Sequence, residues 1–314
     1  MKLRATLAAI LILIVIVACG DGTPESAGGA GLMVVATTNI VADLVRTVGG
    51  PRVVVEALMG PGIDPHLYKA SAGDVRRMSS AQAIFYSGLH LEGKMSEVLG
   101  RMAERGVRTE AVAECVPKQE LIESADFSGL YDPHVWFDVA LWSQAAHCVA
   151  ETLSDLDPEH ADVYEARATS AIQELLSLDK WVRKELEALA PEQRVLVTAH
   201  DAFGYFGRAY GFEVRGLLGV STASEAGTAD VQELAEFITE RRIPAIFVET
   251  SVPPRYVQAL REAVTARGFA VEIGGSLYSD SLGSPGTREE SYDGTVRANV
   301  ETLVSALAVS SHSQ

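Results

Sequence analysis

The sequence lacks the short motifs that mark the common metal-dependent, serine-dependent and nucleotide-dependent enzymes. It contains no His-Glu-x-x-His, no Gly-x-Ser-x-Gly and no phosphate loop of the form Gly-x-x-x-x-Gly-Lys-Ser/Thr. These absences weigh against a zinc protease, a hydrolase with a nucleophile elbow and a P-loop enzyme. We therefore do not expect the chain to be an enzyme.

Basic residues are few compared with acidic ones. The chain has 26 Lys and Arg residues against 42 Asp and Glu residues, a net charge of −16. Removal of residues 1–19, the leader predicted below, takes away Lys2 and Arg4 and no acidic residue, which leaves 24 against 42, or −18. This balance disfavours nucleic acid and anionic lipid surfaces as partners, and it is compatible with attraction of cations.

Apolar runs long enough to span a membrane are also missing. The longest run, from Ala5 to Ala18, is shorter than the roughly 20 residues that a spanning helix needs. It follows the basic segment Met1-Lys2-Leu3-Arg4, and this order is typical of a secretory signal, here residues 1–19. We therefore expect export rather than a permanent transmembrane anchor.

The end of this leader resembles a bacterial lipobox. The stretch Ile16-Val17-Ala18-Cys19-Gly20 implies that Cys19 becomes the lipid-modified first residue of the mature protein. Residues 20–31 are rich in Gly, Ser, Ala and Pro, which predicts a flexible tether. The alternative is an ordinary cleaved signal that carries a cysteine by chance.

Cysteine is scarce, with three residues in the chain. If Cys19 carries a lipid, Cys115 and Cys148 remain. In an oxidising compartment such a pair suggests one disulfide. Both cysteines also lie in apolar stretches, where buried free thiols are common, so the sequence leaves both states open.

The chain that follows is long and apolar enough for two packed lobes, with 314 residues and 47% hydrophobic residues. Short apolar runs alternate with helical patterns, which indicates βαβ units and parallel sheets. The predicted strands are Leu32–Thr37, Val53–Leu58, Ala83–Ser87 and Val107–Ala113 in one lobe, and Arg194–Thr198, Phe212–Leu217, Ala245–Glu249 and Ala270–Ile273 in the other.

A single helix is predicted between the lobes. Residues 158–190 contain no internal Gly or Pro, Asp157 is a good N-cap, and Pro158 is a good first helical residue. Such a helix would be roughly 45 Å long. We therefore expect an N-terminal lobe over residues 32–157, a linking helix over 158–190 and a C-terminal lobe over 191–314.

Four widely separated residues stand where strand or turn signals end: His66, His134, His200 and Asp280. Ligands of open α/β sheets bind at the carboxyl ends of the strands, and three imidazoles with one carboxylate suit a divalent transition metal. A catalytic zinc usually has three protein ligands and an open position, so a fourth ligand argues against a zinc hydrolase. His66 and His134 belong to the first lobe and the other two to the second, which predicts a site between the lobes.

The motifs around these residues resemble the zinc and manganese solute-binding lipoproteins of bacterial ABC importers. The resemblance extends in order over essentially the whole mature chain. It rests on 64–68 (Asp-Pro-His-Leu-Tyr), 88–92 (Gly-Leu-His-Leu-Glu), 132–136 (Asp-Pro-His-Val-Trp), 200–206, 210–211, 219–222, 224–227 and 275–283.

The resemblance implies two four-stranded α/β lobes joined by one long rigid helix, with His66, His134, His200 and Asp280 as the ligands of one metal at the interface. Manganese-binding members commonly carry Glu where this chain has His200, and zinc-binding members often carry a His-rich loop that is missing between Cys115 and Asp132. Softness of the ligands favours Zn²⁺, while bidentate Asp280 would also allow Mn²⁺. Because ligating imidazoles are neutral, we expect affinity to fall below a pH of about 6.5.

It also implies an extracytoplasmic lipoprotein, in the periplasm or on the outer face of the cell membrane. We expect a monomer that delivers the metal to a membrane permease powered by a cytoplasmic ATPase. The alternatives are a surface adhesin with a structural metal and the same fold with another ligand such as a siderophore. An adhesin would not need four such ligands, and the motifs lack the basic residues that a siderophore pocket would want. Asp64, Asp132, Glu225 and Glu249 are candidates to orient the histidines.

Overall fold

The computed structural model describes residues 31–124 and 129–308. The predicted leader with Cys19, and the predicted tether apart from Gly31, lie outside the described residues. Among the helices of the described part, none combines the length and the apolar character that a membrane crossing requires.

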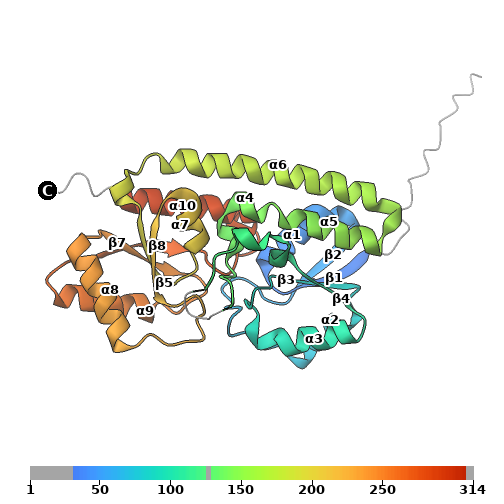
Figure 1. Ribbon diagram of the computed structural model, residues 1–314, viewed down its shortest axis with the longest axis horizontal. Helices are drawn as coiled ribbons and strands as arrows, with labels where there is room; N and C mark the ends of the chain where they lie inside the picture. Colours follow the sequence, from blue (N-terminus) through green and yellow to red (C-terminus); the bar gives the residue numbers. More distant parts are fainter. Residues whose placement is uncertain (1–30, 125–128, 309–314) are drawn as a thin grey trace, which may run out of the picture. The chain divides into compact units, whose positions relative to one another are not determined.

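The first lobe is built on a parallel four-stranded sheet in the order β2-β1-β3-β4. Helices α1 and α5 cover one face, and α2 and α3 cover the other (Figure 1). The strands and helices of this lobe are β1 (Leu32–Ala36), α1 (Asn39–Gly49), β2 (Val53–Ala57), α2 (Ala72–Ser80), β3 (Ala83–Tyr86), α3 (Ser96–Glu104), β4 (Arg108–Ala111), α4 (Val139–Trp142) and α5 (Ala145–Leu156).

The second lobe also contains four strands, all in parallel pairs. They form two hydrogen-bonded pairs, β5 with β6 and β7 with β8, and β5 lies beside β7. From the sequence we expect one four-stranded sheet here, whereas the described residues form two two-stranded sheets. The predicted α/β class is confirmed. The elements are β5 (Val195–His200), α7 (Gly204–Tyr210), β6 (Glu213–Leu218), α8 (Thr228–Arg241), β7 (Ala245–Glu249), α9 (Arg255–Ala266), β8 (Glu272–Leu277) and α10 (Tyr292–Ala308).

Short 3₁₀ turns complete the described secondary structure. They are η1 (Gly50–Arg52), η2 (Gly93–Met95), η3 (Val112–Cys115), η4 (Lys118–Glu120), η5 (Val135–Phe137), η6 (Pro158–His160), η7 (Pro191–Gln193) and η8 (Arg288–Glu290).

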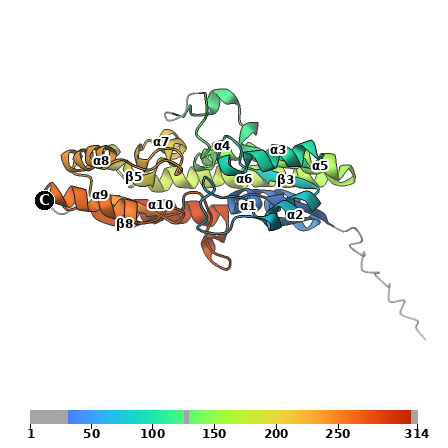
Figure 2. The ribbon, with the colours of Figure 1, turned by 90° about the horizontal axis from the view of Figure 1, so that it is seen from below.

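Helix α6 (Ala161–Leu186) runs past the strands of both lobes (Figures 1 and 2). Its 26 residues correspond to about 39 Å, less than the length expected from residues 158–190. The helix is shorter at both ends, since it begins at Ala161 and ends at Leu186. At the start, the Asp157 carboxylate bonds to the side chains of His160 and Tyr164 instead of to backbone N–H groups. Residues Pro158–His160 consequently form a 3₁₀ turn before the α-helix begins.

Both ends of α6 are fastened to neighbouring elements. In the first lobe the Arg167 guanidinium donates to the carbonyls of Thr47 and Val48 at the end of α1. In the second lobe Arg194 donates to the Leu186 carbonyl at the end of α6 and to the Tyr210 carbonyl. These hydrogen bonds fix one end of α6 to the first lobe and the other end to the second lobe.

One hydrophobic core continues from lobe to lobe on the α6 side. It includes Val45 of α1, Leu178 of α6, Phe203 before α7 and Val300 of α10. Two smaller cores lie on the far sides of the sheets, one under α2 and α3 and one under α8 and α9. Because packed interiors resist deformation, relative movement of the lobes is most restrained along α6 and least restrained on the other side.

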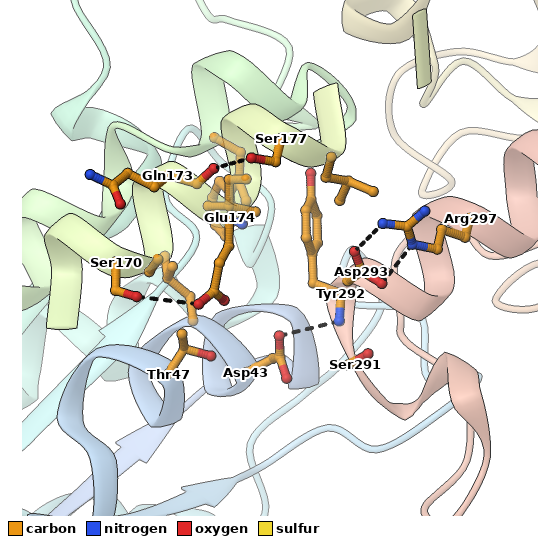
Figure 3. A pocket seen from close by; sticks show the side chains of 15 residues that line it. Asp43, Thr47, Ser170, Gln173, Glu174, Ser177, Ser291, Tyr292, Asp293 and Arg297 are labelled. Atoms are coloured by element: carbon orange, nitrogen blue, oxygen red, sulfur yellow. Dashed lines mark hydrogen bonds and ion pairs between the residues drawn. The ribbon is translucent and has the colours of Figure 1, made fainter. Parts of the chain in front are cut away.

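A cavity of about 630 Å³ lies between α1, α6 and α10 (Figure 3). Its walls include Asp43 of α1, Glu174 of α6 and Arg297 of α10. The Asp43 carboxylate accepts the backbone N–H of Tyr292 at the start of α10. This bond links the two lobes directly.

Cys115 and Cys148 form a disulfide. The bond joins η3 to α5 inside the first lobe and closes a loop over a sequence separation of 33. The structure thereby decides between the two states that the sequence left open.

We expect the double substitution Cys115→Ser with Cys148→Ser to lower the free energy of unfolding by about 2–4 kcal/mol, because the loop is then free in the unfolded chain. Denaturant titration of the metal-free protein measures this change. Metal affinity should stay within about threefold, since the bond lies outside the site described next. An unchanged unfolding midpoint would contradict the stabilising role.

Candidate metal centre

The structure brings together the four predicted side chains, which lie far apart in the sequence. One donor atom from each of His66, His134, His200 and Asp280 lies within 4.8 Å of the others. His66 Nε2 is 3.4 Å from His134 Nε2, and His200 Nε2 is 3.3 Å from Asp280 Oδ2. All four residues are buried, with exposed fractions of 0–4%. Two come from each lobe.

The first two histidines are held by the same local device, the sequence Asp-Pro-His. Asp64 Oδ1 accepts the backbone N–H of His66 at 2.9 Å, and Asp132 Oδ1 accepts that of His134 at 2.9 Å. A short carboxylate that bonds to the backbone two residues later forms an Asx turn. The turn points each imidazole inward from a loop.

The other two residues belong to the second lobe, where His200 ends β5 and Asp280 follows the end of β8 by three residues. His200 is the last residue of β5 and is fully buried. Its backbone N–H donates to Glu249 Oε1 at the end of β7, and its Nδ1 lies 2.6 Å from Glu249 Oε2. Glu249 therefore ties together the two neighbouring strands and orients the imidazole so that Nε2 faces Asp280.

Three of the four candidates for orienting the histidines contact them. Asp132 Oδ1 is 2.7 Å from His134 Nδ1, and Glu249 bonds to His200 as described. Asp64 bonds to the backbone of His66 instead of to its ring. Glu225 is exposed, and within the described residues no hydrogen bond joins it to a site histidine. That candidate was wrong, because its loop leaves it at the surface.

Two contacts at the site were missed by sequence reasoning. Ser251 Oγ lies 3.5 Å from Asp280 Oδ2 and 2.7 Å from Ser279 Oγ. The Trp136 ring packs edge-on against the His134 ring at 5.2 Å between centroids. Ser251 follows Glu249 by two residues, so its place at a strand end was the available signal.

Burial and charge act differently on the site's titrating groups. Burial lowers the pKa of His66 to about 3, against the attraction of Asp280. Burial also opposes a charge on His200, but Glu249 and Asp280 outweigh it and raise the pKa of His200 well above its ordinary value. The Asp280 pKa is lowered despite burial, because the surrounding imidazoles, His200 foremost, favour the carboxylate. From the sequence we expect one pKa of about 6.5 for the site histidines. In the structure the pKa of His66 lies below that value and the pKa of His200 lies above it.

The donor set fits a transition-metal cation. An ion with four tetrahedral bonds of about 2.1 Å separates neighbouring donors by about 3.4 Å. The separations recorded between the Nε2 atoms and Asp280 oxygens are 3.3–3.9 Å. His200 Nε2 and Asp280 Oδ1 are buried, and neither atom has a hydrogen-bond partner among the described residues. A buried polar atom without a partner is costly, and a cation would supply the partner.

The raised pKa of His200 predicts proton release on metal binding. At neutral pH the metal-free imidazole carries a proton that an incoming ion displaces, so affinity should continue to rise with pH above about 6.5. Calorimetric titration in buffers of different ionisation enthalpy should detect close to one proton per Zn²⁺. Glu249→Gln should reduce this number, because the carboxylate that favours imidazolium is gone. An unchanged proton count in that variant would contradict the assignment.

The chain matches the family model described as zinc-uptake complex component A, periplasmic, over residues 34–306. Its structure is similar to the solved periplasmic zinc-binding protein TroA from Treponema pallidum, with 50% sequence identity and a TM-score of 0.85. The match covers 88% of this chain and 99% of that one.

Two curated relatives carry manganese in their names. The manganese-binding lipoprotein MntA of Bacillus subtilis (strain 168) is 46% identical over 92% of this chain and 94% of its own length. The manganese ABC transporter substrate-binding lipoprotein PsaA of Streptococcus mitis is 29% identical over 98% of this chain and 99% of its own length. The similarity therefore extends over almost the full length of proteins named for two different metals.

Proposed function

The chain belongs to the family of periplasmic zinc-uptake components A, and we propose that it captures one divalent transition metal, most tightly zinc, between its lobes. Its role is extracytoplasmic solute binding for an ABC importer. The metal is cargo, which the protein binds and releases without chemical change, so the chain is not an enzyme. The convergence of four buried donors from two lobes carries the proposal.

In this proposal His66, His134 and His200 each bind the ion through Nε2, and Asp280 binds it through one or both oxygens. Asp280 Oδ1 is 3.5 Å from His134 Nε2, while Oδ2 is 3.3 Å from His200 Nε2 and 3.9 Å from His66 Nε2. Both oxygens thus face the donors. A monodentate carboxylate completes four ligand atoms, and a bidentate one completes five.

The donor chemistry favours zinc, although relatives of similar identity are named for zinc and for manganese. Three imidazole nitrogens suit Zn²⁺, whereas Mn²⁺ prefers more oxygen ligands. The stability order places zinc above manganese for a site of this kind. A five-coordinate arrangement with both Asp280 oxygens gives Mn²⁺ a weaker alternative.

We expect His200→Ala and Asp280→Ala each to weaken Zn²⁺ binding by at least about 100-fold, equivalent to about 2.7 kcal/mol. His147→Ala is the matched control, because this histidine is exposed on α5. Competition of Zn²⁺ and Mn²⁺ against a chromogenic chelator measures the affinity of the three variants and of the unaltered protein. Tighter binding of Mn²⁺ than of Zn²⁺ by the unaltered protein would overturn the metal preference.

Metal should also stabilise the folded protein. Free Zn²⁺ at 1,000 times its dissociation constant adds about 4 kcal/mol to the free energy of unfolding. The melting temperature of metal-free protein should therefore rise when Zn²⁺ is added and fall again with a chelator. A melting temperature that Zn²⁺ and Mn²⁺ both leave unchanged would contradict metal binding at this site.

The partners are the permease and ATPase of an importer. We further propose that Cys19 carries a lipid that anchors a monomeric body to the membrane, on the evidence of the lipobox-like sequence before it. Metabolic labelling with a radioactive fatty acid should mark the unaltered protein and leave Cys19→Ser unlabelled.

The delipidated protein should sediment as a monomer. Sedimentation as a dimer would contradict this expectation.

A further inference from the structure

The segment that carries Asp280 is held by the opposite lobe. Asp280 follows β8 in the second lobe, yet two of its near neighbours in sequence bond to the first lobe. Trp136 Nε1 donates to the Ser279 carbonyl at 3.1 Å, and the Gly62 N–H donates to Ser281 Oγ at 2.9 Å.

A third link between this segment and the first lobe is made by Asn39 through two hydrogen bonds. Its amide oxygen accepts the backbone N–H of Leu282 at 2.9 Å, and its amide NH₂ donates to the Leu282 carbonyl at 3.2 Å. A primary amide is matched to the backbone N–H and C=O of one residue because it offers a donor and an acceptor side by side. The two residues are 243 positions apart.

Asn39 is placed for this task by α1. It is the first residue of the helix, after the N-cap Thr38, whose hydroxyl accepts the N–H of Val41. One turn further, on the same face of α1, Asp43 accepts the N–H of Tyr292 from α10 (Figure 3). The start of α1 therefore carries two consecutive contacts to the second lobe.

We propose that Asn39 is a positioning residue for the metal site. It holds the Asp280 segment against the first lobe, so that separation of the lobes at this point withdraws the carboxylate from His66 and His134. The inference rests on the proposed function. It adds the place where lobe movement is converted into loss of a ligand.

The chain provides a matched control for this contact. Asn299 of α10 makes the same reciprocal pair with Tyr278, donating to its carbonyl at 2.8 Å and accepting its N–H at 2.9 Å. That pair lies entirely within the second lobe, on the other side of Asp280. It holds the same segment with the same chemistry but does not cross between the lobes.

The test is the rate of Zn²⁺ release from the full-length protein, followed by stopped flow with a chelator. We expect Asn39→Ala to release Zn²⁺ about tenfold faster. Asn39→Asp should be intermediate, because its carboxylate still accepts the Leu282 N–H but donates nothing to the carbonyl. Asn299→Ala should remain within about threefold of the unaltered rate, since Ser279 and Leu282 are still held by the first lobe.

A double-mutant cycle separates positioning from general loosening. If Asn39 acts through Asp280, Asn39→Ala should accelerate Zn²⁺ release by less than about threefold when Asp280 is already Ala. The inference is overturned by an equal acceleration in the Asn39 and Asn299 variants, by an Asn39 effect that persists undiminished without Asp280, or by an unaltered release rate in a folded Asn39→Ala. Failure of the unaltered protein to bind Zn²⁺ or Mn²⁺ would instead refute the proposed function.

Discussion

The buried carboxylate of Asp280, surrounded by three imidazoles, is the interaction on which the site depends. A carboxylate with an exposed fraction of 1% is tolerated only if positive charge or hydrogen bonds compensate it. Without metal, the compensation falls mainly to His200, whose protonated form is favoured by Asp280 and Glu249 together. A divalent cation supplies the same compensation more completely, and the proton leaves. Under the proposed function, binding therefore exchanges a proton for a divalent metal ion at this site.

The surrounding fold both supports and limits that exchange. The core that continues beneath α6 joins the lobes along one side, where packing would have to break before the lobes could part. At the site itself the lobes are joined by polar contacts, including the pair between Asn39 and Leu282 and the bond from Thr222 Oγ1 to Asp64 Oδ2 at 2.6 Å. Hydrogen bonds contribute about 1 kcal/mol each, so these contacts restrain the lobes less than the packed core does.

The four candidate ligands are held in different ways in the two lobes. His66 and His134 are fixed by turns that the first lobe contains completely, since each depends on a carboxylate two residues before it. His200 and Asp280 depend on longer connections, to Glu249 across neighbouring strands and to Asn39 across the lobes. The second pair is thus the more sensitive to a change in tertiary structure, and it is the pair that sets the charge of the site.

Much of the fold and the four candidate ligands was predictable from local sequence. Apolar runs of strand length marked seven strands to within two residues of their bounds, but the eighth run, Ala270–Ile273, met only the start of β8 (Glu272–Leu277). Helical periodicity marked the helix between the lobes, and Asp-Pro-His marked two turns, because these signals act over a few residues. Only the tertiary structure decided what depends on distance through space: the disulfide between Cys115 and Cys148, the division of the second lobe's strands into two pairs, and the separate pKa values of His66 and His200. The pairing of Asn39 with a residue 243 positions away belongs to the same class. No local pattern encodes it, since it exists only after packing has brought two lobes together.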